Sequence, residues 1–210
     1  MTCKIIATGS SGNAVLVNGV LLDCGVPFKK LEPYYRGFQL VLLTHIHGDH
    51  FNESTVRKLA ELRPTLRFGA GEWMLNRLHR AGVPDSRIDI YNMEQVYTYG
   101  NGFSVEAFPL LHDVQNCGYK LNLNGEKVFY ATDTGSLDGI SAKGFNLYLI
   151  EANYRTEELH ARQKEKLESG EFSYENRAEA GHLSREQADA FLMENAISSS
   201  QFAYLHEHKG

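Results

Sequence analysis

The sequence predicts an α/β fold in which two β-sheets pack as a sandwich with helices outside. Short β runs punctuated by glycine fill the first half of the chain, and further β runs recur in the second half. Helical stretches separate the strands in both halves, which is the pattern of a layered α/β domain. With 210 residues, the chain is long enough for one well-buried core and short for two full domains. We therefore expect one domain over residues 1–210.

The first half reads as strands joined by short turns. Asn18-Gly19 is a strong hairpin dipeptide, and the four apolar residues Leu40–Leu43 indicate a strand covered on both faces. Ser54 is a suitable N-cap for the helix that follows. The expected elements are strands at Cys3–Thr8, Ala14–Val17, Val20–Leu22, Leu40–Leu43 and Leu66–Phe68, a tight loop at Gly9–Asn13, and helices at Ser54–Leu62 and Glu72–Arg80.

The second half contains a β-rich part and two helices. Asn124-Gly125 predicts another hairpin turn. Ser184 and Gln187 occupy the positions of a capping box at the start of a helix. The stretch Arg155–Ser169 is helical by propensity but highly charged, so we expect it at the surface or across the mouth of the active site. The expected strands are Ser104–Phe108, Gly118–Leu123, Lys127–Ala131, Asn146–Ile150 and Phe202–Leu205, and the expected helices are Arg155–Ser169 and Ser184–Asn195.

Composition narrows the class of protein. The formal net charge of -5 argues against a basic coat protein for nucleic acid, although a bound metal pair would add about four positive charges to a nuclease site. The three cysteines, Cys3, Cys24 and Cys117, are widely spaced and fit reduced thiols. The N-terminus lacks the pattern of a secretion signal, and no apolar stretch approaches the roughly 20 residues that span a bilayer. We expect a cytoplasmic protein without a membrane partner.

Histidines are the most informative residues. His45, His47 and His50 lie with Asp49 within six residues, directly after the buried strand. In a loop, the His-x-His spacing lets two imidazoles converge on one cation. Imidazoles and a carboxylate at a partly open site suit zinc, manganese or iron. The alternative is that this segment is only a polar, solvated turn. This is disfavoured because such turns rarely contain three histidines and an aspartate at this spacing.

The segment Thr44-His45-Ile46-His47-Gly48-Asp49-His50 resembles the HxHxDH hallmark of the metallo-β-lactamase superfamily. Two further landmarks of that superfamily follow in order, His112 in Leu110-Leu111-His112-Asp113 and Asp133 in Ala131-Thr132-Asp133-Thr134. The resemblance implies a four-layer αββα sandwich and a hydrolase with two divalent metal ions, zinc or manganese. Read without it, His112 could equally be a capping residue and Asp133 a turn former.

The resemblance also implies a ligand set. His45, His47 and His112 would hold the first metal, and Asp49, His50 and a late histidine the second, with Asp133 shared by both. A shared carboxylate offsets the repulsion between two cations about 3.5–4 Å apart. The candidates for the late ligand are His206, His182, His160 and His208. We favour His206 because it ends the apolar strand Phe202–Leu205, where the superfamily places its last ligand.

A helix start indicates the branch of the superfamily. Gly181-His182-Leu183-Ser184 begins a helix, where backbone N–H groups favour an anion, and it resembles a motif of the ribonuclease Z branch. In that branch the histidine is paired with a glutamate after a strand, which Glu151 matches here. His182 as a neighbour of the helix cap, without chemistry, is the alternative.

The glycine-rich loop Gly9–Asn13 and the strand end Asp23-Cys24-Gly25 resemble the WalJ-type (YycJ-like) branch, compact DNA exonucleases common in bacteria and phages. Asp23 would then support a ligand histidine, and a simple turn residue is an equal alternative. Missing side chains in the loop would let backbone N–H groups meet phosphate oxygens. The expected substrate contacts are Ser10, Ser11, Gly12, Asn13 and Ser184.

The function that follows is a dinuclear metal-dependent phosphodiesterase, a nuclease of the DNA exonuclease type. A hydroxide shared by the metals would attack phosphorus, Asp49 would orient it or accept its proton, and His182, held by Glu151, would stabilise the phosphoryl oxygens or protonate the leaving alkoxide. A small cyclic nucleotide is the alternative substrate. Hydrolysis of a thioester or lactam ranks lower, and a histidine-rich metal store ranks last.

The expected partner is nucleic acid, with DNA favoured, or a nucleotide, and a homodimer is one of the open assemblies. Basic side chains could form a track for nucleic acid, although scattered basic residues usually form only a solvated face. These residues are Arg57, Lys58, Arg63, Arg155, Arg162 and Lys164.

Overall fold

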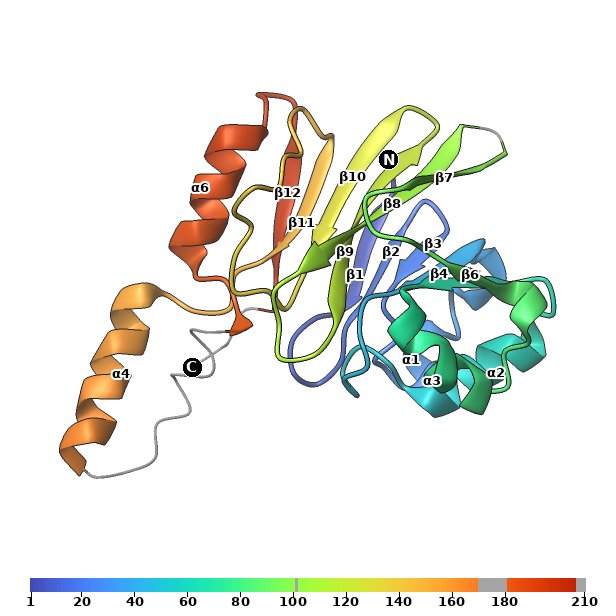
Figure 1. The fold of residues 1–210 in the computed structure, drawn as a ribbon, viewed down its shortest axis with the longest axis horizontal. Coiled ribbons are helices and arrows are strands. Elements are labelled where there is room, and N and C mark those ends of the chain that lie inside the picture. Colours follow the sequence, from blue (N-terminus) through green and yellow to red (C-terminus); the bar gives the residue numbers. More distant parts are fainter. Residues whose placement is uncertain (101, 170–180, 207–210) are drawn as a thin grey trace. The chain divides into compact units, whose positions relative to one another are not determined.

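Two six-stranded β-sheets with associated helices make up the computed structural model of the protein (Figure 1). The structure describes residues 1–100, 102–169 and 181–206. The chain divides into two compact units, Met1–Tyr97 (unit 1) and Thr98–Gly210 (unit 2). The predicted α/β class with two sheets is confirmed. The expectation of one domain over 1–210 stays a prediction.

Unit 1 contains the first sheet, in which the strands follow one another in chain order. The pairs β1–β2 and β2–β3 are antiparallel, and β3 to β6 run parallel. The strands are β1 (Cys3–Ala7), β2 (Ala14–Val17), β3 (Val20–Leu22), β4 (Leu40–Leu43), β5 (Arg67–Ala70) and β6 (Ile88–Ile90). Because β3 and β4 are parallel, the residues that follow them emerge at the same edge of the sheet.

Three helices cover one face of this sheet and lie beside one another in Figure 1. They are α1 (Phe28–Leu31), α2 (Glu53–Leu62) and α3 (Leu75–Arg80), and three short 3₁₀ turns lie at Tyr35–Gly37, Glu72–Met74 and Asp85–Arg87. Val56 and Leu59 of α2 are fully buried in one cluster with Val41 and Leu43 of β4. Burial of this apolar face stabilises α2 on the sheet.

The turn predicted in unit 1 agrees with the structure, whereas the predicted helix cap does not. The hairpin turns at Asn18 and Gly19, which have φ values of 45° and 87°, as expected of this dipeptide. The N-cap of α2 was expected at Ser54, and this is wrong. Asn52 caps the helix by accepting a hydrogen bond from the Thr55 backbone N–H at 3.0 Å. Asn and Ser cap equally well, so sequence pattern alone does not choose between two such residues two positions apart.

Unit 2 contains the second sheet, in the order β12-β11-β10-β9-β8-β7. Strands β8, β9 and β10 pair antiparallel, whereas β10, β11 and β12 pair parallel. The strands are β7 (Val96–Tyr99), which crosses the boundary between the units, β8 (Phe103–Leu110), β9 (Asn116–Leu123), β10 (Glu126–Ala131), β11 (Leu147–Glu151) and β12 (Gln201–Leu205). Strands β8, β10, β11 and β12 therefore all point in one direction, so their C-terminal ends share an edge.

Two helices follow β11 in the described part of unit 2. Helix α6 (Arg185–Asn195) lies alongside β12 and β11 in Figure 1 and begins with the predicted capping box. Its buried Phe191 and Leu192 pack with Phe129 and Ile150 of the sheet. Helix α4 (Thr156–Ser169) is charged, as expected. Among the residues that the structure describes, no helix combines the length and apolarity needed to cross a membrane.

Candidate functional site

Two parallel strands of unit 1 bring Asp23 and Thr44 together. Asp23 follows β3 and is fully buried, with φ of 58°. Thr44 follows β4, and both its backbone N–H and its hydroxyl donate to Asp23 Oδ1 at 2.9 Å. The Asp23 carboxylate therefore fixes the point at which the chain enters the histidine segment.

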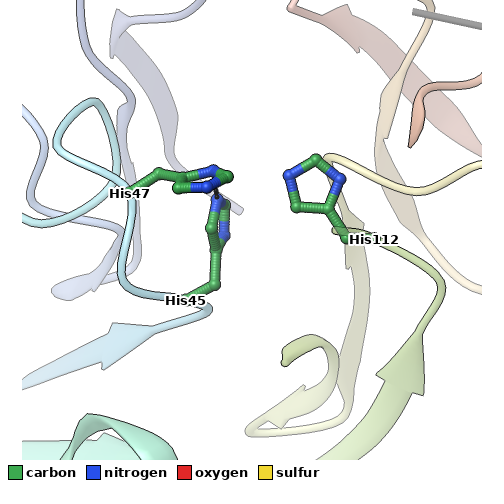
Figure 2. Close-up of side chains that lie close together, drawn as sticks. All are labelled: His45, His47 and His112. Atoms are coloured by element: carbon green, nitrogen blue, oxygen red, sulfur yellow. Dashed lines mark hydrogen bonds between the residues drawn. The ribbon is translucent and has the colours of Figure 1, made fainter. Parts of the chain in front are cut away.

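The hydrogen bonds of Thr44 also orient His45. Because the Thr44 hydroxyl donates to Asp23, its oxygen accepts from His45 Nδ1 at 2.9 Å, which leaves His45 Nε2 as the unprotonated nitrogen. That nitrogen lies 3.1 Å from His47 Nδ1, and the two rings meet edge to face (Figure 2). Two nitrogens in the shell of one tetrahedral zinc ion, each at 2.0–2.1 Å, lie about 3.3 Å apart. The spacing of the two rings thus fits one divalent cation.

His50 is held by the same carboxylate. Its Nδ1 lies 2.8 Å from Asp23 Oδ2, and both side chains are fully buried. A histidine that donates one ring nitrogen to a carboxylate has its other nitrogen fixed for a metal. The His50 Nε2 lies 3.6 Å from Asp49 Oδ2. The predicted contact between Asp23 and a histidine of the segment is present, and the role of His50 as a ligand stays a prediction.

The glycine-rich loop of unit 1 packs directly beneath this segment. The Asn13 backbone N–H donates to the Asp49 carbonyl oxygen at 2.6 Å, and its side-chain Nδ2 lies 2.8 Å from His50 Nε2. A Cβ on Gly25 would come within 1.7 Å of the Asp49 carbonyl oxygen, and one on Gly12 would come within 2.5 Å of the Gly25 carbonyl oxygen. Only glycine permits this stacking of three backbone segments.

The edge shared by four strands of unit 2 collects the second group of residues. His112 and Asp133 lie two residues beyond β8 and β10, Glu151 is the last residue of β11, and His206 follows β12. Donor atoms of Asp133, Glu151, His182 and His206 all lie within 4.8 Å of one another. Imidazoles and carboxylates together are a donor set that suits a divalent cation.

The pair predicted between His182 and Glu151 is present. His182 Nδ1 lies 2.6 Å from Glu151 Oε1 and 3.2 Å from Asp133 Oδ1. Glu151 is fully buried and also accepts from the Thr134 and Leu183 backbone N–H groups, at 3.0 and 3.4 Å. His206 Nδ1 lies 3.2 Å from each of the two carboxylates. Glu151 therefore connects the start of α6 with the end of β12.

The protonation of two histidines follows from these surroundings. Burial by itself lowers the pKa of His182, but the hydrogen bonds and charges of Asp133 and Glu151 outweigh it and raise the pKa to about 10. Burial is the main cause that lowers the pKa of His112. The neutral ring is the form that ligates metals.

His112, the third side chain drawn in Figure 2, is anchored like the other ligand candidates. Its Nδ1 lies 3.1 Å from the Gly181 carbonyl oxygen. A ring N–H donated to a backbone carbonyl directs the remaining nitrogen toward a metal. The same pattern at His45, His50 and His112 shows that the residues present fit divalent metal ions.

The other predicted residues differ in their surroundings. Ser10 and Ser11 are exposed in the loop, whereas Gly12 and Asn13 are buried. The Ser184 hydroxyl accepts from the Gln187 backbone N–H at 3.1 Å as the cap of α6. Of the candidates for the late ligand, His206 and His182 both lie in the cluster of unit 2, His160 is exposed on α4, and His208 lies outside the described residues.

Three supporting residues were missed by the sequence analysis. Asn116 Nδ2 donates to the Thr132 and Asp133 carbonyl oxygens, at 3.1 and 2.7 Å, and so holds the left-handed turn at Asp133. Asn153 Nδ2 lies 3.1 Å from His206 Nδ1. The Trp73 indole N–H donates to the Thr44 carbonyl oxygen at 3.1 Å. No sequence signal marks these residues, because each acts across the fold on a distant segment.

Comparison with known proteins identifies the family of the chain. A family model described as the β-lactamase superfamily domain matches residues 18–202. The chain belongs to this family. No curated protein matches the sequence.

Solved structures match over nearly the whole chain. The metallo-β-lactamase fold protein YhfI from Bacillus subtilis has a TM-score of 0.74 at 18% identity, covering 99% of this chain and 86% of its own. The short form of human tRNase Z has 0.68 at 15%, covering 99% and 93%. A diphosphatase of the PhnP family has 0.65 at 15%, covering 98% and 86%. The protein thus has the metallo-β-lactamase fold, as predicted.

Proposed function

We propose that this protein is a dinuclear metal-dependent phosphodiesterase that acts as a nuclease, with DNA as the favoured substrate. The observation that carries the proposal is the shared anchoring of the candidate ligands. His45, His50 and His112 each have Nδ1 hydrogen-bonded to a protein oxygen, so that Nε2 is the nitrogen set for a cation.

The ligand assignment follows the family pattern. His45, His47 and His112 would hold one cation, Asp49, His50 and His206 would hold the other, and Asp133 would be shared. When bound, two divalent ions lower the pKa of water to about 7 and neutralise charge that develops on the phosphate. Zinc or manganese matches these nitrogen and oxygen donors. The Asp49 carboxylate, whose Oδ2 lies 3.6 Å from His50 Nε2, would orient the attacking water or accept its proton.

His182 and Glu151 supply the acid of the reaction. The buried Glu151 carboxylate at 2.6 Å stabilises the protonated imidazole, and the ring carries a proton that it can donate to a leaving alkoxide. The carboxylate also fixes the orientation of the ring through Nδ1, so that Nε2 faces the substrate. A general acid in this position contributes roughly 10²–10⁴-fold to the rate.

The structural neighbours support phosphorus chemistry over acyl transfer, since by name one is a tRNase and another a diphosphatase. A small cyclic nucleotide is the second candidate. One observation favours it: unit 2, which carries His182, Glu151 and His206, has seventeen Asp and Glu against ten Lys and Arg. A strongly acidic surface repels a long polyanion more than a mononucleotide.

A substrate panel tests the proposal. The purified protein, loaded with zinc or manganese, is assayed on bis(p-nitrophenyl) phosphate, single- and double-stranded DNA, RNA, cyclic nucleotides, a thioester and a lactam. We expect hydrolysis of the phosphodiesters, fastest on DNA, and loss of activity in His45→Ala and after chelation. Turnover of the thioester or lactam alone would overturn the proposal. Turnover of cyclic nucleotides without cleavage of any polymer would select the second candidate.

A further inference from the structure

Basic side chains in unit 1 lie over aromatic rings at one surface. The Lys4 ammonium lies 4.6 Å from the centre of the Tyr34 ring, and the Lys58 ammonium lies 4.5 Å from that of Phe28. The Arg36 guanidinium lies 5.6 Å from the centre of its neighbour, the Tyr35 ring. Each pair is a cation–π contact, which holds a flexible basic side chain in place at the surface.

One ring contact joins two of these pairs, and the third pair is adjacent in the chain. The Phe28 and Tyr35 rings are 5.3 Å apart, and Tyr34 precedes Tyr35 in the chain. The three rings are half-buried, because they pack against the core of unit 1. We call these paired residues the cationic-aromatic face and include with them Lys29 and Lys30, the exposed residues of α1 that directly follow Phe28 in the chain. The paired residues are Lys4, Phe28, Tyr34, Tyr35, Arg36 and Lys58.

Charge on this face opposes the charge of the whole protein. Its five basic side chains are all exposed, and the segment 27–38 that forms most of it contains one acidic residue, Glu32. Unit 1 has eleven Lys and Arg against nine Asp and Glu, although the chain as a whole has a net charge of -5. A local excess of positive charge on an acidic protein favours a polyanionic partner at that place.

We propose that the cationic-aromatic face binds single-stranded nucleic acid, an inference that rests on the proposed nuclease function. Ammonium and guanidinium groups neutralise phosphates, and a basic side chain that moves from its ring to a phosphate leaves the exposed part of that ring to an unpaired base. A duplex stacks its bases internally and would use only the charges. An anionic membrane gains less from this face, because its rings are half-buried and its exposed side chains include no large aliphatic one that could insert.

The face belongs to the same unit as the histidine segment. α1 begins five residues after Asp23, the carboxylate that holds His50. Gly25 between them lies against the Asp49 backbone. The chain therefore runs from the ligand support to this face without an intervening flexible segment.

Charge reversal tests the inference through binding, independently of cleavage. Fluorescent oligo(dT), a duplex of equal length and phosphatidylserine vesicles are titrated with the full-length protein in a chelator. The variant is Lys29→Glu/Lys30→Glu, which alters exposed residues outside the proposed catalytic machinery. Its matched control is Lys127→Glu/Lys143→Glu, which changes the charge equally in unit 2, with Lys127 at the start of β10, away from the edge that carries Asp133.

We expect wild type to bind oligo(dT) more tightly than the duplex. The Lys29/Lys30 variant should weaken oligo(dT) binding about tenfold and reduce the slope of log K against log salt by roughly 1.4, the loss of two phosphate contacts at 0.7 each. The control should bind like wild type. Any of four results would overturn the inference. They are an equal weakening of oligo(dT) binding in the Lys29/Lys30 variant and the control, tighter binding of the duplex than of oligo(dT), binding of vesicles alone, or no binding.

Hydrolysis of bis(p-nitrophenyl) phosphate separates this inference from the proposed function. The Lys29/Lys30 variant should hydrolyse this small ester at the wild-type rate. Oligo(dT) binding without any phosphodiester hydrolysis would contradict the proposed function and support the binding face. Hydrolysis without oligo(dT) binding would sink the inference and leave the phosphodiesterase.

Discussion

The two units differ in how their sequences place the candidate ligands. In unit 1, one short segment, His45–His50, carries all the candidate ligands, and a single carboxylate from the neighbouring parallel strand, Asp23, orients it. In unit 2, the candidate ligands follow three strand ends, the acid lies at one helix start, and its supporting carboxylate ends a fourth strand. A contiguous cluster depends on local backbone geometry, whereas a dispersed cluster depends on correct pairing of the whole sheet.

Their supporting groups differ as well. The Thr44 and His50 contacts to Asp23 join residues 21 and 27 positions apart. The Glu151 contacts of unit 2 reach His182 and His206, which are 31 and 55 positions away. Loss of the supporting carboxylate should therefore have a different effect in each unit. In unit 1, loss of Asp23 should weaken metal binding, and in unit 2, loss of Glu151 should slow proton transfer.

The largest expected effect comes from the acid of unit 2. His182→Ala should lower turnover roughly 10²–10⁴-fold, because the leaving group loses its proton donor, while the metal content measured by mass spectrometry stays at the wild-type value. Glu151→Gln should lower turnover in the same direction. Loss of metal in His182→Ala would instead make His182 a ligand and contradict the assignment of His206.

A smaller effect is expected from the carboxylate support of unit 1. Asp23→Asn should weaken the binding of one divalent ion by about 10- to 100-fold, because His50 Nδ1 loses its charged partner. Competition with a chromogenic chelator measures this affinity. Asp89→Asn, which changes the carboxylate that pairs with Arg67 on the same sheet, is the matched control and should leave metal affinity unchanged. Equal affinities in all three proteins would show that Asp23 is only structural.

The smallest expected effects come from helix caps. Asn52→Ala in unit 1 and Ser184→Ala in unit 2 should each lower the free energy of unfolding by about 1 kcal/mol, since each removes the acceptor for an N-terminal backbone N–H. Ser54→Ala, at the position where the sequence predicted the cap, should change it by only a few tenths. Urea unfolding measures all three. A larger loss for Ser54→Ala than for Asn52→Ala would reverse the assignment of the cap.

The agreement between the sequence predictions and the structure also differs between the two units. In unit 1, the hairpin at Asn18-Gly19 and the strand Leu40–Leu43 were predicted at their observed bounds. Turn dipeptides and unbroken apolar runs are local signals, so they need no knowledge of the partner strand. The short strand β6 and the one-turn helix α1 were not predicted, because three or four residues are too few for a periodic signal.

In unit 2, strands β8 to β12 were found with bounds that differ by at most two residues at either end, whereas β7 was not predicted. The capping box of α6 was predicted in full. The residues around the site were harder. Asp133 and His112 became candidates only through a family resemblance, since a single Asp or His after a strand has many structural uses. Asn116 was not foreseeable, because its contact with Asp133 depends on the register of β9 against β10.

Metal stoichiometry in a double-mutant cycle tests the central claim most directly. At a fixed free concentration of zinc, we expect wild type to bind two ions, while His45→Ala from unit 1 and His112→Ala from unit 2 should each lose the same single ion. The double variant should then lose no more than either single variant. Independent, additive losses, or a full complement of metal in either single variant, would contradict a centre built from both clusters.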